Sequence, residues 1–144
     1  MSAEVQFQAL SLAACVVWAQ TPRRTVGDLT ELAESVRSVG VLEPLLARPR
    51  GDGWEILAGQ RRFLAAGLAG LTEVPALVRD VPDDVALELA LAENSARADV
   101  SPLEEAEAIE RLVRDHGRSV ADVAARLGRG VRWVERRRSL LNLT

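Results

Sequence analysis

The spacing of hydrophobic and polar residues changes near residue 80. Between residues 28 and 79, apolar residues come in short runs that glycine and proline interrupt. From residue 84 to residue 141, they recur at helical spacing between capping residues. The first pattern predicts a small mixed α/β unit and the second an all-α unit. We therefore expect an α+β protein with domains at residues 1–82 and 83–144.

Two helices and three strands are expected in the first unit. Asp28 is expected to cap a helix that ends at Gly40, and a shorter helix is expected over residues 60–68. Residues 1–27 show no clear pattern. Pro44 falls in the first expected strand and implies an edge strand or a bend. The three strands are expected at residues 41–48, 54–58 and 74–79.

The helical unit carries clear start and stop signals. Asp83 is expected to cap its first helix, and Ser101, followed by Pro102, is expected to cap the second. Two further helices are expected over residues 120–128 and 131–141. The three-residue turn between them has the length that a helix-turn-helix motif uses.

Composition narrows the class of protein. The chain has 144 residues, of which 48% are hydrophobic and 27% are charged, so it can bury a core. No apolar run approaches the ~20 residues that a membrane span needs, so we expect no membrane association. The single cysteine, Cys15, excludes an intramolecular disulfide framework. A cytoplasmic protein is the default expectation.

The net charge of −3 hides an asymmetry along the chain. Residues 1–110 hold 9 Arg against 18 Asp and Glu, whereas residues 111–144 hold 9 Arg against 3 Asp and Glu. A basic segment on an acidic body suggests an anionic partner, either nucleic acid or an acidic membrane surface. A helix with a solvated arginine face explains the charge equally well.

The basic segment coincides with the expected helix-turn-helix. In such a motif the second helix enters the major groove, where its early residues face base edges and flanking arginines meet phosphates. Ala124 is small enough for close helix crossing, and Gly128 suits a left-handed turn, whereas Arg138 stands where an apolar residue is usual. An ordinary helical hairpin with a basic surface is the alternative. The candidate DNA-binding residues are Arg118, Ser119, Arg129, Arg132, Trp133, Arg136 and Arg137.

A second candidate site lies at residues 59–62, where a strand gives way to a helix. The sequence Gly-Gln-Arg-Arg combines a glycine that lets the backbone approach an anion with the N–H groups of a helix start and two positive charges. Taken alone, a solvated arginine pair is the commoner explanation. Glu93 and Asn94, with Arg97, suit a metal and a phosphate at one helix end. They suit an ordinary i, i+4 ion pair at a helix end equally well.

Read in order, these segments resemble the conserved boxes of the ParB family of partition proteins. The resemblance covers roughly residues 15–143, and the helix-turn-helix follows the boxes at the family's usual distance. It implies a mixed α/β, ParB/sulfiredoxin-like amino-terminal domain followed by an all-α helix-turn-helix domain. The matching segments are residues 32–36 and 40–45 for the first box, 59–66, 69–70 and 74–79 for the second, and 93–106 for the third.

The resemblance also implies a function. ParB proteins bind a centromere-like DNA site for plasmid or chromosome partition, together with a ParA-type ATPase. They bind CTP with Mg²⁺, and the homodimer acts as a CTP-dependent clamp on double-stranded DNA. A location on the nucleoid or a plasmid in the cytoplasm follows. The alternative is a ParB-like transcription regulator without a partition role.

By position in the boxes, the resemblance implies the residues of a nucleotide site. Glu93 and Asn94 would also hold the metal. Gln60 is the candidate catalytic residue, but it stands where the family has a Glu implicated in CTP hydrolysis, so weak CTPase activity is left open. Leu64 replaces a common third arginine, and Thr21 replaces a Gln. The implied nucleotide-binding residues are Arg23, Gly40, Glu43, Pro44, Gly59, Gln60, Arg61, Arg62, Glu93, Asn94 and Arg97.

Two enzyme classes are disfavoured by the residues present. Sulfiredoxin shares the small fold but needs a reactive cysteine in the phosphate loop. This chain has Gln60 in that loop and its cysteine, Cys15, elsewhere. A nuclease would need a compact cluster of metal-binding carboxylates, and the sequence offers none.

Overall fold

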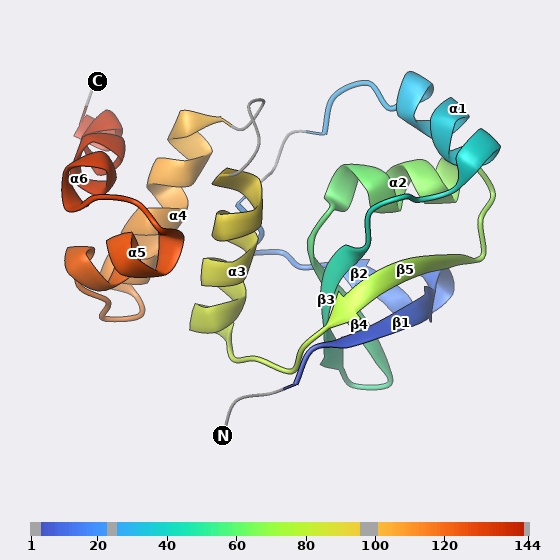
Figure 1. The fold of residues 1–144 in the computed structure, drawn as a ribbon, viewed down its shortest axis with the longest axis horizontal. Helices are drawn as coiled ribbons and strands as arrows, with labels where there is room; N and C mark the ends of the chain where they lie inside the picture. Colours follow the sequence, from blue (N-terminus) through green and yellow to red (C-terminus); the bar gives the residue numbers. More distant parts are fainter. Residues whose placement is uncertain (1–3, 23–25, 96–100, 143–144) are drawn as a thin grey trace. The chain divides into compact units, whose positions relative to one another are not determined.

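The computed structural model describes residues 4–22, 26–95 and 101–142 (Figure 1). These residues form two compact units. The first consists of the described residues up to 81 apart from Pro22, and the second of Pro22 and the described residues from 82 onward. Within these ranges, no helix is both long enough and apolar enough to span a membrane.

The first unit is a five-stranded mixed sheet with two helices on one face (Figure 1). Its spatial strand order is β1-β5-β3-β4-β2. The pairs β1–β5 and β3–β4 are antiparallel, whereas β3–β5 and β2–β4 are parallel. The elements are β1 (Gln6–Ser11), β2 (Cys15–Val17), α1 (Thr30–Val39), β3 (Leu45–Arg50), β4 (Gly53–Ala58), α2 (Gln60–Leu68) and β5 (Glu73–Val78), with a 3-10 turn at Leu12–Ala14.

The core of this unit lies between the sheet and the two helices. Leu45 and Ala47 of the central strand β3 are fully buried, because alternate residues of a strand point to the same face. They belong to one apolar cluster with Val36 of α1 and Ala65 of α2. This packing fixes α2 on the sheet, and with it the turn that joins β4 to α2.

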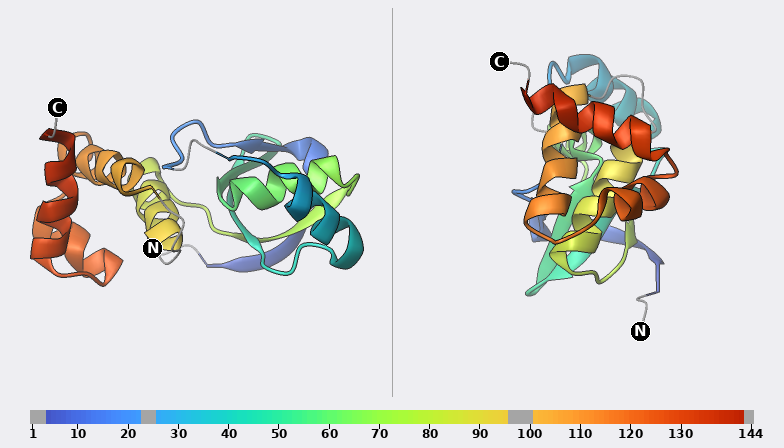
Figure 2. Two further views of the ribbon diagram at one scale, coloured as in Figure 1. Left: turned by 90° about the horizontal axis from the view of Figure 1, so that it is seen from above. Right: turned by 90° about the vertical axis from the view of Figure 1, so that its left-hand side faces the viewer.

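The second unit is helical. It comprises α3 (Asp83–Ser95), α4 (Pro102–Arg114), α5 (Val120–Leu127) and α6 (Val131–Ser139), followed by a 3-10 turn at Leu140–Asn142. Helix α6 packs on α4 and α5, and α5 also packs on α3 (Figure 2). The largest fully buried side chains here are Leu87, Leu91, Ile109, Leu112, Val123 and Val134.

The predicted caps of α4 and α5 are confirmed, whereas Asp83, predicted as a cap, is the first residue of α3. The Ser101 hydroxyl accepts a hydrogen bond from the Glu104 N–H (3.2 Å), and the Ser119 hydroxyl accepts one from the Asp122 N–H (3.0 Å). Gly128 ends α5 with φ of 67°, in the left-handed region. The described part of this unit contains helices and turns and no strand.

Two strands are missing from the sequence prediction, and both form edges of the sheet. In β1, Leu10 is fully buried, but Phe7 is 68% exposed. The strand therefore lacks the clear alternation by which a half-buried strand is recognised. Strand β2 is three residues long, too short to give a periodic signal.

Of the two alternatives that Pro44 implied for the first predicted strand, a bend is found next to Pro44, at Glu43, and the edge position is wrong. Strand β3 begins at Leu45, directly after Pro44, and lies in the centre between β5 and β4. Pro49 lies inside β3, but beyond Ala47, the last residue that pairs with β5. A proline without an N–H donor is tolerated there because the strand has a single neighbour at that point.

The predicted cap of α1 is also wrong. The helix begins at Thr30, with Leu29 at its N-cap. The Asp28 carboxylate instead accepts hydrogen bonds from the N–H (2.9 Å) and the hydroxyl (2.7 Å) of Thr30. These bonds hold the pKa of Asp28 below its ordinary value.

Candidate nucleotide-binding and DNA-binding sites

The turn from β4 into α2 presents backbone N–H groups to solvent or a ligand. Gly59 caps α2 with φ of 93° and ψ of 26°, and a Cβ at this position would lie 2.6 Å from Leu45 Cδ2. Both the left-handed backbone and the close approach therefore require glycine. The Phe63 N–H donates to the Gly59 carbonyl (2.9 Å), so the N–H groups of residues 60–62 precede the first helical bond. Such a helix start favours anions.

Two arginines of this turn hold neighbouring loops by their carbonyl oxygens. Arg61 donates from Nε to Val26 (2.8 Å) and from Nη2 to Asp28 (3.2 Å). Arg62 donates from Nη1 to the carbonyls of residues 43 (3.0 Å) and 44 (3.2 Å). The structure thus brings together the predicted site residues Glu43, Pro44, Gly59, Arg61 and Arg62.

The other predicted nucleotide-site residues lie elsewhere or are buried. The Oε1 atom of Gln60 is buried and has no hydrogen-bond partner among the residues that the structure describes. Glu93 and Asn94 lie near the end of α3 in the second unit, and Asn94 is 4% exposed. Arg23 and Arg97 fall outside the described residues. Gly40 ends α1 with φ of 78°, just ahead of the loop that Arg62 binds.

The side chains present fit a triphosphate better than a metal site built by protein alone. Within the described ranges, no group of three or more His, Cys, Asp or Glu side chains could hold a metal ion. Magnesium keeps near-octahedral oxygen coordination and is commonly held by one or two carboxylates plus substrate phosphates. Of the predicted pair, Glu93 offers one such carboxylate, whereas Asn94 is buried.

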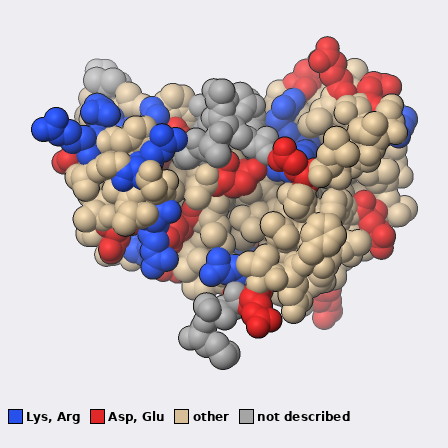
Figure 3. Space-filling view, viewed as in Figure 1, with Lys and Arg blue, Asp and Glu red and all other residues tan. Residues whose placement is uncertain are grey.

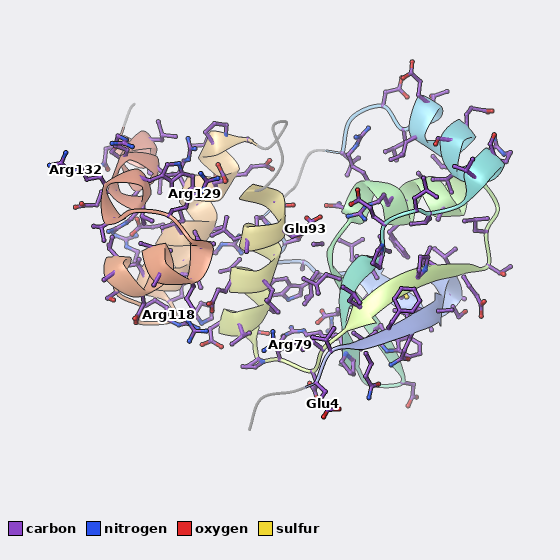
Figure 4. The ribbon with its side chains drawn as sticks, viewed as in Figure 1. Glu4, Arg79, Glu93, Arg118, Arg129 and Arg132 are labelled. Carbon is purple, nitrogen blue, oxygen red and sulfur yellow. The ribbon has the colours of Figure 1, made fainter. Side chains whose placement is uncertain are left out.

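In the helical unit, several arginines are neutralised by carboxylates of α3. Arg118 Nη2 lies 3.0 Å from carboxylate oxygens of both Asp84 and Glu88, and Arg126 lies 3.3 Å from Glu88 (Figure 4 labels Arg118). The hydrogen bond from Arg118 holds the pKa of Asp84 below its ordinary value. Arg118, a predicted DNA-binding residue, therefore has a packing role within this unit, with its side chain 14% exposed.

Carboxylates of α4 neutralise further arginines. Arg137 Nε lies 3.3 Å from Oε1 of Glu105, which is 5% exposed. Arg138 donates two hydrogen bonds to Glu110 (3.1 and 3.3 Å), and these lower the pKa of Glu110. Arg138 occupies a position where the motif usually has an apolar residue, and Glu110 explains how a charge is accommodated there.

Three arginines in α6 or just ahead of it, Arg129, Arg132 and Arg136, are exposed. Arg132 extends away from the ribbon (Figure 4). The Arg129 guanidinium stacks on the Trp133 ring, with its Cζ 4.7 Å from the ring centroid, and Arg137 stacks at 4.6 Å. Basic side chains gather on this part of the helical unit (Figure 3).

The sequence did not predict the carboxylates that pair with Arg118, Arg137 and Arg138. Glu88, Glu105 and Glu110 all precede the basic segment, so a count along the chain placed them in the acidic body. A signal was nevertheless present. Glu105 shares the buried face of α4 with Ile109 and Leu112, at helical spacing. A carboxylate on an apolar face needs a partner, which predicts a nearby cation.

Comparisons with known proteins decide the family. Residues 3–95 match a family model described as the ParB N-terminal domain. The chain belongs to the ParB family. It is 46% identical over 140 residues to the probable chromosome 1-partitioning protein ParB of Deinococcus radiodurans, and 52% identical over 101 residues to the chromosome-partitioning protein ParB of Myxococcus xanthus.

These matches cover 96% and 70% of this chain, but 48% and 34% of the two relatives. The chain thus spans half or less of the length of these curated relatives. The family that the sequence motifs indicate is confirmed by the family model and by these identities.

Two solved structures of a truncated ParB from Caulobacter crescentus share the fold. The structure complexed to the centromeric parS site has a TM-score of 0.70 and 33% identity, and covers 95% of this chain and 73% of that one. The structure complexed with CTP-gamma-S has a TM-score of 0.60 and 35% identity, and covers 96% of this chain and 80% of that one. The mixed α/β ParB amino-terminal fold is therefore confirmed.

Proposed function

We propose that this chain is the nucleotide-binding and DNA-binding part of a chromosome-partition protein of the ParB family. The observation that carries the proposal is the meeting of the Arg62 guanidinium, the Gly59 turn and the loop at residues 43–44, within a fold shared with ParB relatives solved with parS DNA and with a CTP analogue. The unit boundaries at residues 1–82 and 83–144 belong to this proposal.

The nucleotide site lies at the start of α2. The N–H groups of residues 60–62 and the guanidinium groups of Arg61 and Arg62 bind the triphosphate of CTP, since a helix start and two cations offset much of its charge. The loop at residues 40–44 borders the nucleoside. Bound CTP would supply a scissile phosphoanhydride bond. Glu93 and Asn94 would hold Mg²⁺, which would offset phosphate charge; this assignment, like those of Arg23 and Arg97, follows from the family resemblance alone.

The DNA site lies on the hairpin of α5 and α6, which acts as a helix-turn-helix. Helix α6 enters the major groove, where Arg132 and Arg136 are the exposed cations available to bases and phosphates. Arg129, Ser119 and Trp133 flank them at the ends of the two helices. Arg118 and Arg137, which lie against carboxylates, position this surface rather than leading the contact.

The proposal extends to the whole protein. A homodimer would close on double-stranded DNA as a CTP-dependent clamp and would work with a ParA-type ATPase on the nucleoid or a plasmid. Weak CTPase activity is part of the proposal, limited by Gln60. An amide can orient a water, but it lacks the charge of a glutamate.

The proposed DNA binding is tested with two fluorescein-labelled duplexes. One carries the parS site of the Caulobacter relative, and the other is a scrambled duplex of the same composition. Fluorescence anisotropy at about 150 mM salt should give at least about tenfold tighter binding to the parS duplex, because specific complexes exceed non-specific ones by orders of magnitude. Equal binding to both duplexes would mean that the chain does not recognise this site.

A further inference from the structure

Four side chains form a continuous line from the interior of the helical unit to the turn before α6. Glu105, on the buried face of α4, lies 3.3 Å from Arg137. Arg137 and Arg129 each stack on the ring of Trp133, at 4.6 and 4.7 Å from its centroid. The line thus runs from Glu105 through Arg137 and Trp133 to Arg129.

The spacing along α6 explains why these side chains meet. Arg129, Trp133 and Arg137 are four residues apart, so successive members lie on one face of the helix and of the turn ahead of it. Glu105 comes from another helix, α4, and is 5% exposed. It is therefore too deeply buried to touch a ligand of the size of DNA.

The charges show why Glu105 matters for Arg129. Two guanidinium groups on one indole ring repel each other unless one of them is neutralised. Glu105 supplies that neutralisation to Arg137 as an ion pair in which Nε makes no hydrogen bond to any residue that the structure describes, and this reduces the repulsion that Arg129 meets at the shared ring. Stacking on an aromatic ring restricts a guanidinium that would otherwise sample many rotamers. An arginine held in this way loses less conformational entropy when it binds a phosphate.

We propose that Glu105 is a positioning residue for DNA binding: through Arg137 and Trp133, it holds Arg129 ready for a phosphate of the DNA backbone. The proposal rests on the DNA-binding function proposed above. Arg129 lies in the turn ahead of α6 and so flanks the early helix residues that face the bases, and flanking arginines commonly contact phosphates. Its contribution should therefore depend on salt and not on base sequence.

The test compares wild type with Glu105→Gln, Arg129→Ala and the double variant, by anisotropy on the labelled parS duplex at several salt concentrations. Arg129→Ala should reduce the slope of log affinity against log salt by about one, as the loss of one phosphate contact does. Glu105→Gln should weaken binding about three- to tenfold, in keeping with an interaction of cation–π size, and should add little in the Arg129→Ala background.

Glu110→Gln is the matched control. Glu110 also lies on α4 and also pairs with an arginine of α6, Arg138, but that pair does not involve Trp133. Both substitutions remove one negative charge, so both favour DNA equally through net charge. Only Glu105→Gln should weaken binding. If circular dichroism shows that it does not fold, Arg137→Gln breaks the same line from α6; because it also removes a positive charge, it is expected to weaken binding at least as much.

The outcomes separate the two proposals. If wild type does not distinguish the parS duplex from the scrambled one, the DNA-binding proposal fails, and this inference fails with it. If wild type is specific but Glu105→Gln binds as tightly as Glu110→Gln, the positioning role is refuted and the DNA-binding proposal stands. A loss from Glu105→Gln that is undiminished in the Arg129→Ala background also refutes it.

Discussion

Two arginine-rich regions of the molecule hold their guanidinium groups in different ways. At the start of α2, Arg61 and Arg62 are oriented by backbone carbonyl oxygens, and the Glu43 carboxylate, which is 74% exposed, lies 3.5 Å from Arg62. In the helical unit, Arg118, Arg137 and Arg138 lie against carboxylates, which orient them and cancel their charge.

The number of arginines in a segment is therefore a poor guide to its charge. Residues 82–144 contain 10 Arg but 12 Asp and Glu, although the last 34 residues taken alone are strongly basic. Most arginines of these last 34 residues are paired with carboxylates inside the helical unit. An anionic ligand is expected where arginines are held by neutral groups or left exposed, and the following variants test that difference.

The largest effect is expected from Arg62→Ala on CTP binding. Because carbonyl oxygens orient this guanidinium beside the Gly59 turn, its removal should cost about 10- to 160-fold in CTP affinity, the range for charge-assisted bonds. Equilibrium binding of labelled CTP measures it. Arg37→Ala, which removes an exposed arginine paired with Glu34 in the same unit, is the control and should bind as wild type. Unchanged affinity in Arg62→Ala would place the phosphates elsewhere.

The next largest effect is expected from Arg132→Ala on DNA binding. This exposed arginine should contribute about 1–3 kcal/mol if it reads a base, with relaxed specificity at that base. Anisotropy on parS variants with single base changes measures both effects. Arg138→Ala, which removes an arginine paired with Glu110, should lower thermal stability more than DNA affinity. The opposite ranking of these two variants would contradict the division into paired and available arginines.

Gly59→Ala should destabilise the first unit by about 1–3 kcal/mol, because φ of 93° and a contact of 2.6 Å with Leu45 leave no room for a Cβ. Gly67→Ala is the matched control within the same helix. A Cβ there has no neighbour within 4 Å, so this substitution should stabilise the protein by about 0.5–1 kcal/mol. Urea unfolding measures both, and two changes of the same sign would be inconsistent with this geometry.

Gln60→Glu should raise CTP hydrolysis several-fold from a low baseline, since general-base groups contribute to water activation. Release of phosphate under single-turnover conditions measures the rate. The paired variant Gln60→Ala should hydrolyse no faster than wild type. Wild-type turnover as fast as that of the Glu variant would show that the amide is no handicap.

The smallest effect concerns pH. Because the hydrogen bond from Arg118 lowers the folded-state pKa of Asp84 below 3.8, the pair stabilises the fold at pH values above about 3.8. That contribution is lost as the pH falls through the folded-state pKa. The Tm difference between wild type and Asp84→Asn should therefore be present at pH 6 and disappear under strongly acidic conditions. A difference that grows as the pH falls would reverse the assignment.

The features that the sequence predicts well are local ones. The start of α2 after Gly59, the caps at Ser101 and Ser119, and the left-handed end of α5 at Gly128 all depend on residues within one turn of each other. The order of the three family boxes can likewise be recognised in the sequence. These features together were sufficient to identify the family.

The features that the sequence predicts poorly depend on contacts between distant segments. The edge strand β1 is a strand because β5, more than 60 residues away, pairs with it. Glu105 and Arg137 are 32 residues apart, and their pairing neutralises an arginine that the local sequence counts as a positive charge. A sum of charges along the sequence takes no account of the fold. The electric field at the surface depends on which charges the fold brings together.

The most direct test of the account is an equilibrium titration of the chain with labelled CTP and labelled ATP, each with and without the parS duplex. The account predicts saturable binding of CTP with Mg²⁺, much weaker binding of ATP, and a change in CTP affinity when the duplex is present, because binding at two linked sites is reciprocal. Equal affinity for the two nucleotides, or no binding of either, would contradict the assignment of the Gly59 turn as a CTP site.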